Sequence, residues 1–211
     1  MNYVSVHGFN SWRGKTTTDK CKPIVVAHGS EYEEFNYKGG RAGVLPGLLI
    51  TRFGGIQRAG ERLIEQINRG GKPVVLIVHS NGLSVAAVAM ELMERLPKDE
   101  WLIKGVISFS GCLRGDWGFP EGVVVLNNYC PRDWTLKIGA ELRHDILRHP
   151  MWGDMGARPY RGPNQLVIDV ECGKDVNSHS EWFKDAVIKS YVLDSLVRIE
   201  GILNSDKEGH P

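Results

Sequence analysis

The sequence contains no long apolar run and no excess of charge of either sign. Its most apolar stretches, of which Val74–Val78 is typical, are far shorter than the ~20 residues that a helix needs to cross a bilayer. Lysine and arginine total 26 and aspartate and glutamate total 25, which leaves a formal net charge of +1. A chain so nearly neutral has no global field that attracts nucleic acid or anionic lipid. We therefore expect neither a membrane protein nor a nucleic-acid-binding protein.

Sequence markers of export, metal binding and nucleotide binding are also absent. The start of the chain lacks the basic and apolar segments of a secretory signal, so we expect a cytoplasmic protein. The cysteines form no C-x-x-C pair, which favours reduced thiols over a disulfide or a zinc site. The motif G-x-x-x-x-G-K-S/T is missing, and residues 48–60 lack the G-x-G-x-x-G spacing of a dinucleotide site. The sequence thus predicts no cofactor and no metal.

What the sequence does have is a regular succession of apolar runs. With 211 residues, of which 42% are hydrophobic and 24% charged, the chain fits one globular domain, 1–211. Six runs, most of them continuous and rich in valine and isoleucine, predict strands: Tyr3–Val6, Ile24–Ala27, Val74–Val78, Gly105–Phe109, Val123–Leu126 and Leu166–Val170. Such runs are typical of parallel strands that are buried on both faces.

Between the runs, apolar residues recur at helical spacing. They predict three helices, at Gly55–Arg69, Leu83–Leu96 and Lys184–Leu203. Residues 133–162 are less regular and should form loops and short helices at one edge, and residues 204–211 should form a flexible tail. The alternation predicts the α/β class, a three-layer sandwich whose mainly parallel sheet of about six strands has helices on both sides.

Ser80 is the candidate nucleophile. The run Val74–Val78 leads directly into His79-Ser80-Asn81-Gly82 and then into a predicted helix. In the G-x-S-x-G elbow, the serine occupies a strained turn between strand and helix that lifts its hydroxyl above the sheet. Here Val78 replaces the first glycine, so the motif is incomplete. The alternative is a loop serine that caps a helix.

A serine nucleophile needs a base within hydrogen-bond reach and a carboxylate that orients the base. In such sites the order along the chain is serine, acid, histidine, each after a later strand. Asp133 follows the fifth predicted strand and His179 follows the sixth. The competing carboxylates are Asp116, which follows the preceding strand, and less strongly Asp154 and Asp175.

The remaining histidines have weaker claims. His210 lies in the charged tail, His144 and His149 lie in a basic stretch, and His7 and His28 precede glycines. We expect His79 to point away from Ser80. His179 is therefore the predicted base.

Acyl transfer also needs donors for a developing oxyanion. The candidates are the backbone N–H groups of Asn81 and Phe9, the latter after a His7-Gly8 turn, with Asn10 in reserve. Substrate contacts are predicted for His7, Asn10, Trp134 and Trp152. Five aromatic residues indicate either an apolar acyl pocket or core packing: Trp117, Phe119, Trp134, Trp152 and Trp182.

These motifs, in this order, resemble those of the α/β-hydrolase superfamily, and of its small serine hydrolases from bacteriophages and bacteria in particular. The resemblance rests on VHGFNSW, VHSNG, NNYCPRDW, WGDMGARPYRG and NSHSEWF, which lie between residues 3 and 183. It implies Ser80, Asp133 and His179 as the catalytic triad and a loop formed by residues 152–156 and 160–162 beside the site. The short N-terminus implies that the two leading antiparallel strands of the full fold are missing, and little room is left for a lid.

The function that follows is hydrolysis of an ester, or of a thioester or amide, in a small-molecule acyl substrate. Two alternatives remain open at this point. An acyltransferase would use the same three residues with a different acceptor. A non-catalytic protein with the same scaffold, bound to a host protein, would commonly have lost one of the three residues, and none is missing here.

Overall fold

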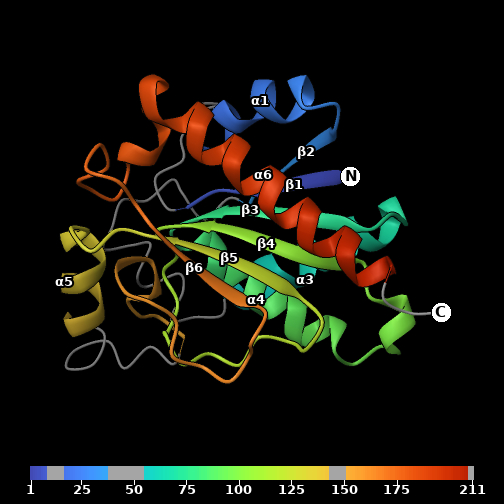
Figure 1. Cartoon of the computed structure of the whole chain (residues 1–211). Helices are drawn as coiled ribbons and strands as arrows, with labels where there is room; N and C mark the ends of the chain where they lie inside the picture. The colour runs from blue at the N-terminus through green and yellow to red at the C-terminus, as the bar shows by residue number, and fades with distance from the viewer. Residues whose placement is uncertain (9–16, 38–54, 143–150, 209–211) are drawn as a thin grey trace.

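The computed structural model describes residues 1–8, 17–37, 55–142 and 151–208 (Figure 1). Its described strands form one six-stranded sheet of order β2-β1-β3-β4-β5-β6, in which every neighbouring pair is parallel. The strands are β1 Asn2–Val6, β2 Glu31–Phe35, β3 Val74–His79, β4 Ile103–Phe109, β5 Val124–Tyr129 and β6 Val167–Glu171. The α-helices are α1 Lys22–Ala27, α3 Gly55–Gly70, α4 Gly82–Met93, α5 Trp134–Leu142 and α6 Asp185–Glu208. Short 3₁₀ turns lie at η1 Thr17–Cys21, η3 Lys98–Glu100, η5 Met155–Ala157 and η6 Glu181–Phe183.

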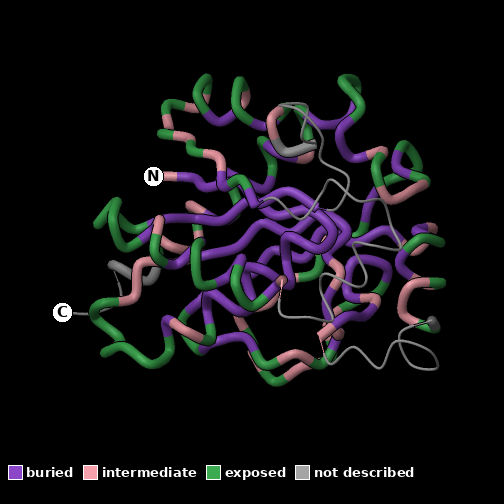
Figure 2. Tube along the Cα trace, turned by 180° about the vertical axis from the view of Figure 1, so that it is seen from behind, coloured by how far each residue is buried: buried purple, intermediate pink, exposed green. Residues whose placement is uncertain are grey.

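Helices cover both faces of the sheet, as predicted (Figure 1). Successive residues of a strand point to opposite faces. In β3, Leu76 therefore packs with α3 and α4, while Val75 and Ile77 pack with α1 and α6. Figure 2 shows that the buried residues concentrate in the sheet and in the helix faces turned toward it. The result is the predicted three-layer α/β sandwich with a parallel sheet. None of the described helices is both long and apolar enough to cross a membrane.

One predicted strand is wrong. Residues Ile24–Ala27 belong to the helix α1, which carries a proline in its first turn, where proline is favoured. Val25 is buried while Val26 is 54% exposed, so this apolar run covers the sheet with one side of a helical turn. The missed strand is β2, whose sequence EYEEF alternates exposed and part-buried residues. It lies at the edge of the sheet, where one row of side chains faces water.

The helix ends differ from the predictions by a few residues. Helix α4 ends at Met93, before the predicted Leu96, while α3 extends to Gly70. Helix α6 continues to Glu208, so residues 204–208, predicted as part of a flexible tail, are helical. Residues 133–162 contain α5 and the short turn η5, as expected for a segment of loops and short helices.

Because all six strands are parallel, their carboxyl ends meet at one edge of the sheet. The segments that follow β3, β4, β5 and β6 therefore lie near one another. We refer to residues 130–133 as the β5 loop and to residues 172–184 as the β6 loop. The predicted nucleophile, acid and base all lie on segments that begin at this carboxyl edge.

Candidate active site

Ser80 occupies a tight turn between β3 and α4. Its φ is 54°, in the left-handed region, where a non-glycine residue costs on the order of 1–3 kcal/mol. The turn is fixed by backbone hydrogen bonds: Ser80 N–H donates to the Phe109 carbonyl (3.2 Å), and Cys112 N–H donates to the Ser80 carbonyl (2.9 Å). The strand-turn-helix geometry expected of a nucleophile elbow is thus present although Val78 replaces the first glycine.

Two glycines allow the end of β1 to approach this turn. A Cβ added at Gly8 would lie 2.7 Å from Ser80 Cβ and 3.3 Å from Ser80 Oγ. A Cβ at Gly82, the first residue of α4, would collide with the Val6 carbonyl oxygen. Larger residues at either position would force the turn and the strand apart, which explains why small residues are needed here.

The structure brings Asp133 and His179 together. The Nδ1 atom of His179 lies 2.8 Å from Asp133 Oδ2, and Asp133 is fully buried. The other carboxylate oxygen accepts the Leu136 N–H at 3.2 Å. Since an ionised carboxylate only accepts hydrogen bonds, Nδ1 carries the proton in this pair. The Nε2 atom of a neutral His179 is then left as the proton acceptor.

The competing carboxylates lie elsewhere. Asp116 accepts two hydrogen bonds from Arg114, at 2.8 and 2.6 Å, on the surface. These bonds lower the pKa of the Asp116 carboxyl. Asp154 pairs with Arg158 at 2.8 Å, and Asp175 accepts a hydrogen bond from the Tyr191 hydroxyl at 3.0 Å. Of the four candidate acids, Asp133 is the one hydrogen-bonded to His179.

The imidazole of His179 lies beside the residue that precedes Ser80. The ring centroids of His79 and His179 are 4.8 Å apart. Within the described part of the chain, no hydrogen bond joins Ser80 Oγ to His179. In structures without substrate such hydrogen bonds are often long, and they shorten when substrate binds.

Three side-chain hydrogen bonds to other segments hold the β6 loop in place. His79 Nε2 lies 3.0 Å from the carbonyl oxygen of His179. Trp182 donates its indole N–H to Ser110 Oγ at 2.8 Å, and Arg132 donates to the Val176 carbonyl at 2.9 Å. These three donors come from the end of β3, from the loop itself and from the β5 loop. The segment that carries His179 is therefore fixed on several sides.

A buried chain of hydrogen bonds lies behind Asn81, the first residue after Ser80. Trp152 donates its indole N–H to Asn81 Oδ1 (2.9 Å), and Asn81 Nδ2 lies 3.5 Å from the Tyr37 hydroxyl. That hydroxyl donates to the His7 carbonyl oxygen at 2.8 Å. The chain connects the start of α4 to the end of β1, which are the two segments predicted to supply oxyanion donors. The first backbone N–H groups of a helix have no partner within the helix, so the one at Asn81 is suited to this use.

The other predicted site residues are placed as follows. Phe9 and Asn10 lie outside the described residues. His7 is buried and stacks on Tyr37 with ring centroids 4.6 Å apart, and burial lowers the pKa of its imidazole. Trp152 is buried in the core, whereas Trp134, next to Asp133, is 69% exposed.

The other aromatic residues predicted near the site pack in the core. Phe119 and Trp182 are buried, and Trp117 packs against the cluster on the α3 and α4 face. Core packing therefore accounts for them better than an open acyl pocket does. Trp134 is the one of the five with a largely exposed ring.

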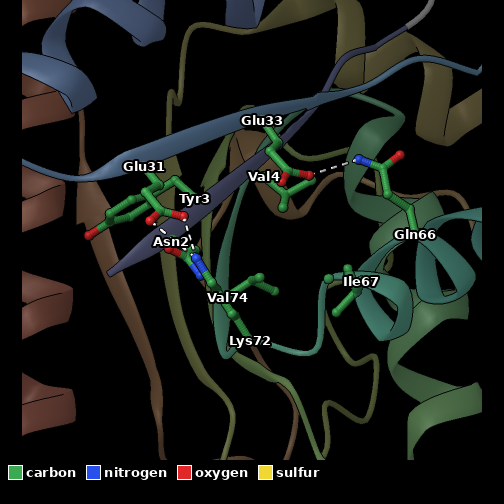
Figure 3. A pocket seen from close by; sticks show the side chains of 10 residues that line it. Asn2, Tyr3, Val4, Glu31, Glu33, Gln66, Ile67, Lys72 and Val74 are labelled. Carbon is green, nitrogen blue, oxygen red and sulfur yellow. Dashed lines mark hydrogen bonds and ion pairs between the residues drawn. The ribbon is translucent and has the colours of Figure 1, made fainter.

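Among the described residues, the structure shows a well-defined cavity but no preformed metal site. No group of three or more His, Cys, Asp or Glu side chains among them is arranged to hold a metal ion. The cavity, of about 230 Å³, is lined by residues at and near the amino ends of β1, β2 and β3 (Figure 3), whereas Ser80 follows the carboxyl end of β3. Its polar lining includes Glu31, Glu33, Gln66 and Lys72.

Sequence reasoning missed several residues that shape the site. His79, which we expected to point away from Ser80, has its ring against His179. Tyr37, Ser110 and Arg132 were not singled out because each acts through a contact with a residue far along the chain. The one available signal was position, since Ser110 and Arg132 follow the carboxyl ends of β4 and β5.

No protein-family profile and no curated protein matches the chain. Solved structures do resemble it. A variant of PytH is 12% identical, with a TM-score of 0.53 over 95% of this chain and 97% of the other. Est1E from Butyrivibrio proteoclasticus, solved with ferulic acid, is also 12% identical, with a TM-score of 0.53 over 95% of this chain and 89% of the other.

A third similar structure is a pyrethroid hydrolase from Sphingobium faniae JZ-2. It is 13% identical, with a TM-score of 0.50 over 94% of this chain and 96% of the other. Identities this low are informative about the fold alone. Together with the parallel sheet and the turn at Ser80, these similarities show that the chain has the α/β-hydrolase fold.

Proposed function

We propose that the protein is a serine hydrolase that cleaves a carboxylic ester through an acyl-enzyme. The observation that carries the proposal is the 2.8 Å hydrogen bond between His179 and Asp133 at the edge of the sheet where Ser80 lies in a strained turn. A structure of the same fold that is named as a pyrethroid hydrolase supports the same reaction class. The identity of the acid, base and nucleophile is part of the proposal.

In the proposed reaction, Ser80 Oγ attacks the carbonyl carbon of the ester while its proton passes to Nε2 of His179. Asp133 holds the imidazole through Nδ1 and stabilises the imidazolium that forms. The proton then passes from His179 to the oxygen of the departing alcohol, which leaves the acyl group on Ser80. A water molecule, deprotonated by His179, hydrolyses this ester and restores the free serine.

The oxyanion of each tetrahedral intermediate needs donors that are already in position. The N–H of Asn81 is one candidate, since the side chain of this residue is fixed by Trp152 and Tyr37. The N–H of Phe9 is the second, because Gly8 lies directly against Ser80. Two such donors lower the barrier by several kcal/mol in known enzymes.

A panel of p-nitrophenyl esters of increasing acyl length tests the proposal. Wild-type protein should hydrolyse at least one ester, and Ser80→Ala should lower kcat by about 10⁴-fold or more. Ser190→Ala is the matched control, since Ser190 is an exposed serine on α6, and it should keep wild-type kcat. Equal turnover by Ser80→Ala and wild type would overturn the proposal. So would the absence of any reaction between folded wild type and a fluorophosphonate.

A further inference from the structure

His79 connects β3 to the β6 loop by its side chain. Its Nε2 lies 3.0 Å from the carbonyl oxygen of His179, and its ring lies 4.8 Å from the imidazole of His179 at an interplanar angle of 40°. On another side, the ring of Phe183 meets it edge-on at 4.9 Å. A single buried side chain thus contacts both the main chain and the ring of the proposed base.

The contact fixes the tautomer of His79. A carbonyl oxygen can only accept, so Nε2 of His79 must carry a proton. Burial is the main cause that lowers the pKa of His79 to about 3, and the nearby His179 adds to the shift. At neutral pH the side chain is therefore an uncharged donor. Its titratable and charged neighbours are His179 on the β6 loop, Asp133 on the β5 loop and His7 at the end of β1.

Asp133 by itself leaves the imidazole of His179 incompletely fixed. One hydrogen bond to Nδ1 holds one corner of the ring, and the ring can still tilt about that contact. The bond from His79 to the main chain of His179 fixes the point from which the ring projects, and the adjacent ring of His79, inclined at 40°, limits its tilt. The direction of Nε2, which must face Ser80 Oγ, then depends on both neighbours.

We propose that His79 is a positioning residue for His179, holding the imidazole in the orientation that accepts the proton of Ser80. This role rests on the proposed function. Because His79 is neutral, it adds no charge that would oppose formation of the His179 imidazolium. It also does not compete with His179 for the proton of Ser80.

The test compares His79→Phe, His79→Gln and wild type. Phenylalanine keeps a ring but loses the donor, whereas glutamine keeps an N–H near the place of Nε2. We expect His79→Phe to lower kcat about 10- to 100-fold, as misplacement of a catalytic group by about 1 Å does, with KM changed less than about 2-fold. His79→Gln should recover part of the lost kcat. The second-order rate of fluorophosphonate labelling, which requires Ser80 and His179 but no deacylation, should fall in the same order.

Tyr191→Phe is the matched control. The Tyr191 hydroxyl accepts the Gly173 N–H at 2.6 Å and donates to Asp175 at 3.0 Å, so it anchors the same loop without touching His179. A loss of kcat in Tyr191→Phe equal to that in His79→Phe would show that any loop anchor has this effect and would overturn the positioning role. Unchanged kcat in Tyr191→Phe supports it.

Two further outcomes separate a failure of the proposed function from a failure of the role of His79. If wild type is not labelled by the fluorophosphonate, the proposed function fails and the role of His79 fails with it. If wild type is labelled and His79→Phe is labelled at the same rate, only the role of His79 fails. Should His79→Phe not fold, the comparison of His79→Gln with His79→Asn replaces it, because the shorter amide cannot reach the His179 carbonyl. Equal kcat in these two variants would then overturn the role.

Discussion

The two edges of the sheet differ in how they hold their polar groups. At the carboxyl edge, buried and part-buried side chains from distant segments bond to one another, as Asp133 does to His179. Both non-glycine residues with positive φ in the described part of the chain, Ser80 at 54° and Ser110 at 46°, also lie there. At the amino edge, around the cavity of Figure 3, Lys72 pairs with Glu31 at 3.0 Å with both side chains more than half exposed.

This difference separates the proposed active site from a solvated surface. Burying polar groups and straining the backbone cost stability, and such costs concentrate at functional sites. An exposed ion pair costs little stability to form and contributes little stability in return. A cavity by itself is therefore weaker evidence of function than the buried hydrogen bonds at the opposite edge.

The largest effect is expected at Asp133. Asp133→Asn should lower kcat on an ester by about 10⁴-fold, because an amide in place of the carboxylate stabilises the wrong tautomer of His179. Asp116→Asn removes the rival carboxylate, which is bound by Arg114 on the surface, and should change kcat less than 2-fold. Initial rates on a p-nitrophenyl ester measure both. Comparable losses of kcat in Asp133→Asn and Asp116→Asn would show that the buried carboxylate matters no more to turnover than the surface one.

The next effect concerns acid stability. The pKa of His79 is about 3 in the folded protein and ordinarily 6.5, so between these values the unfolded chain binds a proton that the folded protein does not. The stability contributed by neutral His79 is fully present above pH 6.5 and is lost as the pH falls toward 3, by about 5 kcal/mol. Across this range, denaturant unfolding should show that the free energy of unfolding depends less steeply on pH in His79→Gln than in wild type. The difference in slope should correspond to up to one bound proton. An unchanged slope would mean that His79 is not held neutral by burial.

A smaller effect distinguishes two glycines, one at each edge. Gly8→Ala places a methyl group 2.7 Å from Ser80 Cβ and should lower kcat about 10- to 100-fold by moving the turn. Gly70 ends α3 beside the amino-edge cavity, and an added Cβ there meets nothing within 4 Å. Gly70→Ala should keep wild-type kcat and raise the free energy of unfolding by about 0.5 kcal/mol. Equal kcat in the two variants would show that close packing at Ser80 is unimportant.

The smallest effect is expected for the amino-edge ion pair. Lys72→Met removes the partner of Glu31 and should change the free energy of unfolding by less than about 1 kcal/mol, and by less still in high salt. Chemical denaturation at two salt concentrations measures this. A loss of several kcal/mol, or a loss of ester turnover, would indicate that the amino edge has a larger role than its exposure suggests.

Sequence alone predicted the parts of the fold that depend on continuous apolar runs. Strands β1, β3, β4 and β5 are buried in the middle of the sheet, and each was recognised. The edge strand β2 was missed because its acidic residues face water and hide its pattern. The run at Ile24–Ala27 predicts a strand, since apolar periodicity cannot separate a short strand from one turn of a buried helix.

The candidate site, too, could be predicted from the sequence only in part. Chain order after successive parallel strands predicted which segments would meet, because topology fixes that. Sequence could not decide between Asp133 and Asp116, since both follow strands and their partners are set by loop conformation. It also could not predict the contact between His79 and His179, which are 100 residues apart along the chain and meet only through tertiary packing.

Mass-spectrometric mapping of a fluorophosphonate adduct is the most direct test of the central claim. We predict one adduct in wild-type protein, on the tryptic peptide that contains Ser80, and none on the peptide that contains the other strained serine, Ser110. The adduct should be absent in Ser80→Ala. No adduct in folded wild type, or an adduct that persists in Ser80→Ala, would contradict the account.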